Sequence, residues 1–177
     1  VGSKIPPNYS FFRLSAQLDT GNVLITKEVF INCGLFDLQF EKMRMGDGEF
    51  GLRSYLNGYL NISNPKASRY HYKTDKGGLR DMGHWDAYRS QNFFSARPIP
   101  SVLYLYRKYW GNYAALLSII QKVPLSYCPY KLKDTKKGYF ISIVSFSIFF
   151  PFIVFQIIYS WYFSSKMLSK GEIIDNL

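Results

Sequence analysis

Cysteine is scarce in this chain. Its two cysteines, Cys33 and Cys128, form no pattern, and neither has the spacing of a metal site. This scarcity excludes a disulfide framework and predicts free, packed thiols in a reducing compartment. An apolar leader is also lacking, because residues 1–7 are polar and contain two prolines. The chain begins with Val1, and we expect it to be a fragment or a processed piece of a longer protein.

Acidic residues are few beside basic ones. The chain has 22 Lys and Arg against 12 Asp and Glu, a formal net charge of +10, and 19% aromatic residues. A basic, aromatic surface suits either nucleic acid or an anionic membrane. The sequence has no zinc spacing and no RNA-binding aromatic motif, so we expect no nucleic-acid partner. A membrane is the partner that the composition favours.

Charge is missing altogether from residues 139–163. This stretch of about 25 residues would be roughly 37 Å long as a helix, enough to cross a bilayer. Tyr139 and Trp161 lie near its ends, and Lys136 and Lys137 precede it, which predicts a transmembrane segment with the body of the protein on the cytoplasmic side. Pro151 either kinks a single span, the alternative we favour, or marks the tip of a re-entrant hairpin. A buried core helix of a soluble protein is the remaining alternative.

The pattern divides the chain into four regions. We expect an α/β unit over 1–98, an amphipathic membrane-proximal helical region over 99–137, the transmembrane or re-entrant segment over 138–165, and a tail over 166–177. The second region either lies in the headgroup layer or packs as an ordinary helix. Pro98 and Pro100 mark its start.

Local signals predict short elements in the first region. The run 21–26 is apolar and β-branched, which indicates a buried strand. A helix over Lys27–Cys33 should follow, with Thr26 as its cap and Gly34 at its end. A second helix should begin at Gly48 and Glu49, with positions 52, 55, 56 and 59 as its apolar stripe. Further short strands are predicted over 60–63 and 67–72.

Two acids stand at the start of the second helix. Asp47 lies between Gly46 and Gly48, and Glu49 follows. The ordinary interpretation is a helix cap, since an acid in the first turn complements the helix dipole. The glycines, however, would let the backbone approach a ligand. A basic loop with His71, Lys73, Lys76 and Arg80 lies downstream. A carboxylate facing such cations indicates a general base beside a bound anionic group.

The order of these motifs resembles the C-terminal, acceptor-side half of a family 2 glycosyltransferase. The resemblance covers about residues 18–85. It is carried by Gly21-Asn22, Gly34-Leu35-Phe36-Asp37, Gly46-Asp47-Gly48-Glu49-Phe50-Gly51-Leu52-Arg53, Gly58-Tyr59 and His71. Two positions depart from the family pattern: Gly46 replaces the usual first acid, and Leu35 replaces the second glycine of the turn. Asp47 stands where the family has its base.

The resemblance implies an α/β fold, a partial GT-A (Rossmann-like) domain, followed here by an interfacial helical region and a C-terminal transmembrane helix. It implies that Asp47 takes the proton of an acceptor hydroxyl. Glu49 and Arg53 would shape the helix start through capping and an i,i+4 pair, and Glu49 is also a candidate, with Gly46, for substrate binding.

The resemblance also gives roles to the basic loop. His71 would ligate a divalent metal, Mg or Mn, or else be structural. Lys73 and Arg80 would pair with the leaving diphosphate, or else belong to a solvated basic loop. Trp85 would stack on a sugar ring or anchor the loop.

The family's nucleotide-binding half carries an Asp-x-Asp motif that we do not find here, so this chain alone is expected to be inactive. The implied function is transfer of a sugar, with inversion, from a nucleotide-sugar donor to a saccharide or lipid-linked acceptor. The reaction would serve surface polysaccharide or glycolipid synthesis at the cell membrane. The alternative is a non-catalytic membrane-anchored protein that binds anionic lipid through a basic aromatic surface, with Asp47 as a helix cap.

Overall fold

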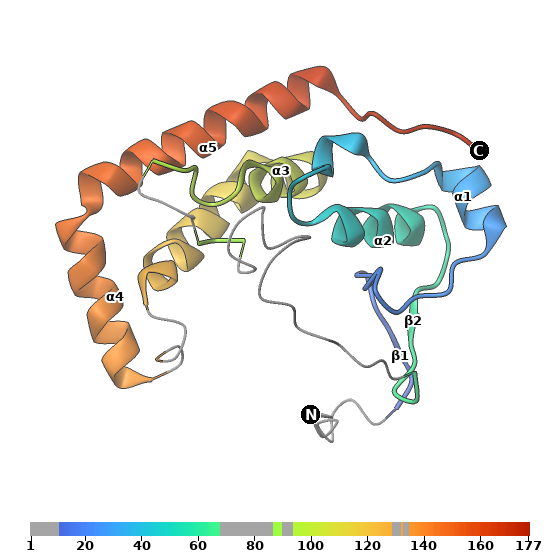
Figure 1. The fold of residues 1–177 in the computed structure, drawn as a ribbon, viewed down its shortest axis with the longest axis horizontal. Coiled ribbons are helices and arrows are strands. Elements are labelled where there is room, and N and C mark those ends of the chain that lie inside the picture. Colours follow the sequence, from blue (N-terminus) through green and yellow to red (C-terminus); the bar gives the residue numbers. More distant parts are fainter. Residues whose placement is uncertain (1–10, 68–86, 90–93, 129–131, 133–134) are drawn as a thin grey trace. The chain divides into compact units, whose positions relative to one another are not determined.

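The computed structural model describes residues 11–67, 87–89, 94–128, 132 and 135–177, and these divide between two compact units. Unit 1 comprises residues 1–41, 45–75 and 172–177, and unit 2 comprises 42–44 and 76–171. Two chain segments far apart in sequence therefore build unit 1. Figure 1 shows the elements of both units.

Short elements make up unit 1, and longer helices make up unit 2. Unit 1 contains β1 (Arg13–Leu14), α1 (Lys27–Cys33), the 3-10 helix η2 (Leu38–Phe40), α2 (Gly46–Leu56) and β2 (Ile62–Ser63). Unit 2 contains α3 (Pro100–Lys122), the 3-10 helix η4 (Pro124–Tyr127), α4 (Lys136–Ile148) and α5 (Phe150–Lys170).

The predicted α/β, Rossmann-like GT-A fold is wrong for this chain. The described residues are mostly helical, and their one sheet has two antiparallel strands, with Arg13 opposite Ser63 and Leu14 opposite Ile62. The predicted strand at 21–26 is a turn followed by irregular chain, and Leu24 within it is 97% exposed. An apolar run becomes a strand only beside a partner that completes its hydrogen bonds, and the described residues supply none there.

Helix α1 has the predicted bounds. It begins after Thr26 and ends at Gly34, whose φ of 76° lies in the left-handed region that glycine adopts without strain. Val29 and Cys33 on its inner side pack with Phe50 of α2 in the core of unit 1.

The predicted apolar stripe of α2 is wrong in part, since Leu52 is half-buried and Tyr59, just beyond the helix, packs against the core of unit 1. Tyr55 and Leu56 are exposed, whereas Phe50 is fully buried. Phe50 stacks on Phe36 with ring centroids 4.6 Å apart and also contacts Phe30. Aromatic packing from outside the helix has thus selected a face that periodicity within the helix did not indicate.

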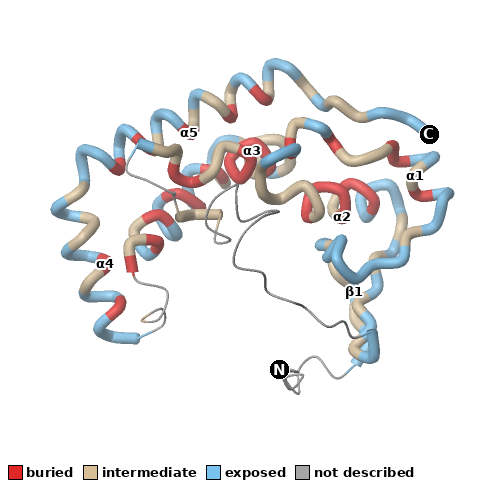
Figure 2. Tube along the Cα trace, in the orientation of Figure 1, coloured by how far each residue is buried: buried red, intermediate tan, exposed pale blue. Residues whose placement is uncertain are grey.

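Unit 2 is built around the contact between α3 and α5. Its core contains Leu103, Ala115, Ile119 and Val123, which pack with Ile153 of α5. Figure 2 shows buried positions recurring along both helices. Within α3 the helical conformation breaks at Gly111, which has φ 80° and ψ 176°.

The same two helices are joined by Arg107 of α3. Its Nη1 donates to Ser164 Oγ at 2.7 Å and Ser165 Oγ at 2.8 Å on α5, and its guanidinium lies 4.2 Å from the ring centroid of Trp161. Burial lowers the pKa of Arg107 from its usual value. The side chain thus holds α3 to α5 through both polar and cation–π contacts.

The predicted single transmembrane helix over 138–165 is replaced by two helices. No helix in the described part of the chain is long and apolar enough to span a membrane alone, but α4 and α5 together meet that test by length and composition. They are bent by 84° across Phe149. Pro151 lies in the first turn of α5, where its missing N–H leaves no helical hydrogen bond unmade.

Candidate active site

Asp47 lies inside the first turn of α2 and is half-buried. It does not occupy the N-cap position, which belongs to Met45, and the Met45 side chain makes no capping hydrogen bond. Asp47 Oδ1 accepts a hydrogen bond of 2.8 Å from the Gly48 N–H, and among the described residues the structure shows no hydrogen bond to its Oδ2.

The backbone just before Asp47 is unusual. Met45 has φ 79° and ψ 5°, in the left-handed region that non-glycine residues rarely adopt. Its carbonyl accepts the Glu49 N–H at 2.8 Å and so starts the helical hydrogen-bond ladder. Such a conformation costs on the order of 1–3 kcal/mol and is kept only where the surroundings enforce it, often at functional sites.

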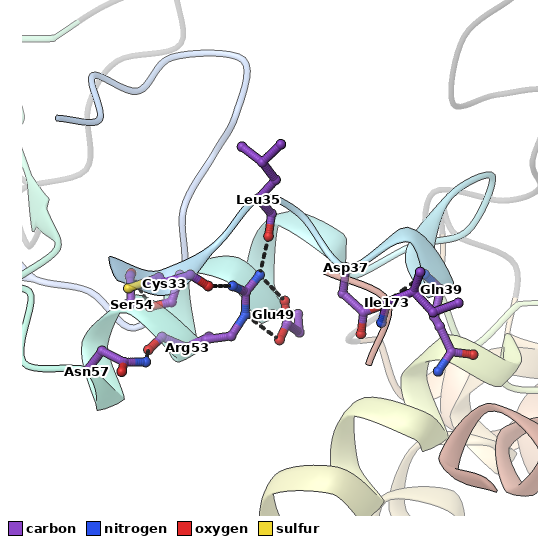
Figure 3. A network of polar contacts seen from close by, with 10 residues as sticks. Cys33, Leu35, Asp37, Gln39, Glu49, Arg53, Ser54, Asn57 and Ile173 are labelled. Atoms are coloured by element: carbon purple, nitrogen blue, oxygen red, sulfur yellow. Dashed lines mark hydrogen bonds and ion pairs between the residues drawn. The ribbon is translucent and has the colours of Figure 1, made fainter. Parts of the chain in front are cut away.

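Arg53 joins α2 to the segment after α1 (Figure 3). Its Nε donates to Glu49 Oε1 at 3.0 Å and its Nη2 to Glu49 Oε2 at 3.2 Å, which is the expected i,i+4 pair. The guanidinium also donates to the carbonyl oxygens of Cys33 and Leu35, the latter at 2.8 Å. Glu49 is completely buried, which indicates a structural role, and its contact with an acceptor stays a prediction.

Asp37 connects the end of the chain to this region. Its Oδ1 accepts the N–H groups of Gln39 at 3.0 Å and Ile173 at 3.1 Å (Figure 3). The backbone of Leu35 bonds to Asp175, and that of Leu38 bonds to Ile173. Residues 172–177, which we call the return segment, therefore run along residues 34–38 and fix the loop that Arg53 also holds.

Gly46 and Gly48 differ in what surrounds them. A Cβ on Gly46 would lie 3.1 Å from Phe40 Cβ, whereas one on Gly48 would meet only Met45 Cε at 3.7 Å. Close packing against Phe40 thus accounts for Gly46. Access of a ligand to the backbone there stays a prediction.

Cys33, whose carbonyl oxygen accepts a hydrogen bond from Arg53, has a buried free thiol. Burial raises its pKa, and the nearby Arg53 opposes this rise only in part. The thiol is therefore protonated at neutral pH and is a poor nucleophile. This agrees with the packing role expected from the sequence.

The positions of the predicted loop residues relative to Asp47 are not described by the structure. His71, Lys73, Arg80 and Trp85 lie outside the described residues. Within the part of the chain that the structure describes, no group of three or more His, Cys, Asp or Glu side chains could hold a metal ion. A role for a divalent metal, Mg or Mn, stays a prediction that depends on His71.

Two hollows lie elsewhere on unit 1. One, of about 260 Å³, is lined by residues that include Phe50, Ser54 and Tyr59. The other, of about 650 Å³, has residues such as Arg13 and Asn22 in its lining. Asp47 lines neither of them.

No protein-family model, curated protein or solved structure matches this chain.

Two parts of the site were not predicted from the sequence. The Glu49–Arg53 spacing indicated the ion pair, but the carbonyl partners of Arg53 depend on the tertiary fold. The bond between Asp37 and Ile173 joins residues 136 positions apart, and no local pattern could have indicated it.

Proposed function

We propose that this chain belongs to an inverting glycosyltransferase and that Asp47 is its general base. The observation that carries the proposal is the position of Asp47, a half-buried carboxylate in the first turn of α2 that follows the left-handed Met45. The competing interpretation, an acid that complements the start of its helix, fits the same position, because Asp47 Oδ1 accepts the Gly48 N–H. The structure contradicts the α/β fold that the resemblance implied, so the proposal rests on Asp47 and on the sequence motifs.

The chemistry requires one proton acceptor of this kind. The acceptor hydroxyl oxygen attacks the anomeric carbon of the donor sugar and forms a new C–O bond. The bond from that carbon to the diphosphate breaks, and the nucleoside diphosphate leaves with the electron pair. Asp47 receives the hydroxyl proton, a role for which a carboxylate is suited. The left-handed Met45 and the buried Glu49–Arg53 pair support a fixed orientation of the first turn of α2.

The proposed substrates follow the resemblance in the sequence. The donor is a nucleotide-sugar, and the acceptor is a saccharide or a lipid-linked sugar in surface polysaccharide or glycolipid synthesis. The basic composition and the bent pair α4 and α5 support a location at the cell membrane, with Asp47 on the cytoplasmic side. Lys73 and Arg80 would pair with the diphosphate, and Trp85 would contact a sugar.

The test is release of nucleoside diphosphate by membranes that contain the full-length protein, assayed over a panel of nucleotide-sugars and acceptors. Asp47→Asn keeps an oxygen that can accept the Gly48 N–H but removes the base. We expect its rate to fall by about a hundredfold or more, within the usual range for losing a general base. Glu41→Gln, which neutralises an exposed carboxylate in the same unit, is the matched control and should keep the wild-type rate.

Equal turnover by wild type and Asp47→Asn would remove Asp47 from the mechanism. Absence of turnover in wild type across the panel would instead favour the non-catalytic protein that binds anionic lipid.

A further inference from the structure

Helix α5 buries polar side chains and exposes apolar ones. Its buried positions recur every three or four residues, and three of them, Gln156, Ser160 and Ser164, are polar. The large exposed side chains of the same helix include Phe150, Phe152, Phe155, Ile158, Tyr159 and Tyr162. Surface helices of proteins in water have the reverse distribution. The outer side of α5 therefore suits an apolar environment.

Helix α4 follows the same rule. Its buried positions are Gly138 and Ser142, and its exposed ones include Tyr139, Phe140 and Ile143 (Figure 2). Small residues on the inner side let neighbouring elements approach closely, as they do between helices in membranes. The two helices thus present one kind of outer surface on both sides of the bend.

Charge is placed only at the far ends of the pair. Lys136 and Lys137 begin α4, Lys166 and Lys170 lie in the last turns of α5, and all four are exposed. Residues 138–165 between them contain no charged side chain. Two basic ends around an apolar middle match anionic headgroups around hydrocarbon.

The bend decides how the pair can fit a bilayer. Helix α4 has 13 residues and is about 20 Å long, shorter than the hydrocarbon core of about 30 Å. The pair is bent by 84°. Helix α5 has 21 residues, so arms of about 20 Å and about 31 Å that meet at this bend reach about 16 Å below the level of their ends, close to the depth of one leaflet, about 15 Å.

We propose that α4 and α5 form a re-entrant V that enters one leaflet of an anionic bilayer. The bend at Phe149 lies deepest, and both basic ends stay at the same membrane surface. In the second half of α3, Tyr113, Leu116 and Ile120 are also exposed. The inference rests on the membrane attachment in the proposed function and is independent of Asp47.

The experiment measures the depth and the sidedness of three outward positions in the full chain. Tyr139→Cys, Phe150→Cys and Tyr162→Cys each receive an NBD fluorophore, and the chain without an added cysteine corrects for labelling of the two buried native thiols. The proteins are added to sealed vesicles of phosphatidylcholine and phosphatidylglycerol. Spin-labelled lipids report the depth of the fluorophore, and dithionite added outside reports its side.

We expect the label at 150 to be deepest, and the labels at 139 and 162 to be shallow and both bleached by external dithionite. A label at 162 that is protected while the one at 139 is bleached would mean a span. Equal shallow depth at all three positions would mean a peripheral surface, and absence of vesicle binding would mean that another protein covers this face. Each of these three results overturns the proposal, and none changes the outcome of the Asp47→Asn assay.

A matched pair of substitutions tests the outer face itself. Ile158→Lys places a charge in the apolar part of α5 and should weaken vesicle binding by about a hundredfold. Ser169→Lys adds the same charge at an exposed position in the polar last turn and should bind at least as well as wild type. Equal binding by the two variants would contradict insertion of this face.

Discussion

Arg53 is the residue on which the order of unit 1 most depends. It holds a buried carboxylate and two carbonyl oxygens from a separate segment. A buried ion pair adds little net stability compared with apolar packing, but removal of one member leaves the other charged and unpaired. Removal of Arg53 is therefore expected to destabilise unit 1 by more than the Glu49–Arg53 attraction stabilises it.

Arg53→Met should lower the free energy of unfolding of unit 1 by about 3–5 kcal/mol, because the buried Glu49 loses this ion pair. Hydrogen exchange of the α2 amides measures this change. Lys27→Met, which removes an exposed charge from α1, is the control and should stay within about 0.5 kcal/mol of wild type. Unchanged exchange in Arg53→Met would show that the buried pair does not stabilise α2.

At the scale of elements, close backbone approach explains one glycine of α2, Gly51. A Cβ on Gly51 would lie 2.8 Å from the backbone N of Leu18 and 3.0 Å from the carbonyl O of Ala16, whereas Gly48 has room for one. The chain at 16–18 is thus pressed against α2 at Gly51. Glycines that look alike in the sequence have different functions in the fold.

Gly51→Ala should destabilise unit 1 by about 1–3 kcal/mol, since backbone atoms must move to admit the methyl group. Gly48→Ala should instead stabilise the same helix by up to about 1 kcal/mol through the better helix propensity of alanine. Pulse proteolysis in urea would compare the two. Similar effects of both substitutions would mean that the approach of residues 16–18 does not constrain α2.

Sequence reasoning succeeded for elements whose ends are set locally. The bounds of α1 follow from Thr26 and Gly34, and the break between α4 and α5 lies beside Pro151. It failed where a distant segment decides the outcome. The buried face of α2 depends on aromatic rings outside the helix, and the run at 21–26 would have needed a partner strand that the described residues do not supply.

In the candidate site, too, the sequence predicted features that depend on one helix and missed those that depend on distant segments. The Glu49–Arg53 pair follows from spacing along one helix, whereas α2 begins at Gly46, two residues before the predicted start. The left-handed conformation of Met45 could not be predicted, because methionine has no preference for it and tertiary packing must impose it. The role of Asp47 in catalysis stays a prediction.

At the scale of the whole molecule, the return segment makes unit 1 discontinuous. The N–H groups of Leu35 and Leu38 are satisfied by carbonyls of residues 175 and 173, and Asp37 accepts the N–H of Ile173. Gly34 lies so close to Ile174 that a side chain on it could not fit. The last residues are thus part of the interior bonding of unit 1.

Deletion of residues 172–177 should destabilise unit 1 by about 3 kcal/mol, because three hydrogen bonds of about 1 kcal/mol each are lost. Proteolysis at residues 34–41 should accelerate, while the α3–α5 contact made by Arg107 should be unaffected. Deletion of Leu177 alone, which is exposed, serves as the control. An unchanged rate of cleavage in the longer deletion would show that the return segment is not needed for stability.

The return segment also sets an order of events during synthesis. Residues 76–171 must leave the ribosome before the chain that closes unit 1 is available, an interval of about 5–20 s at usual elongation rates. During this time the apolar helices of unit 2 emerge while residues 34–38 still lack their partners. Under the proposed membrane attachment, a nascent chain reaches the membrane before unit 1, with Asp47, acquires its final arrangement.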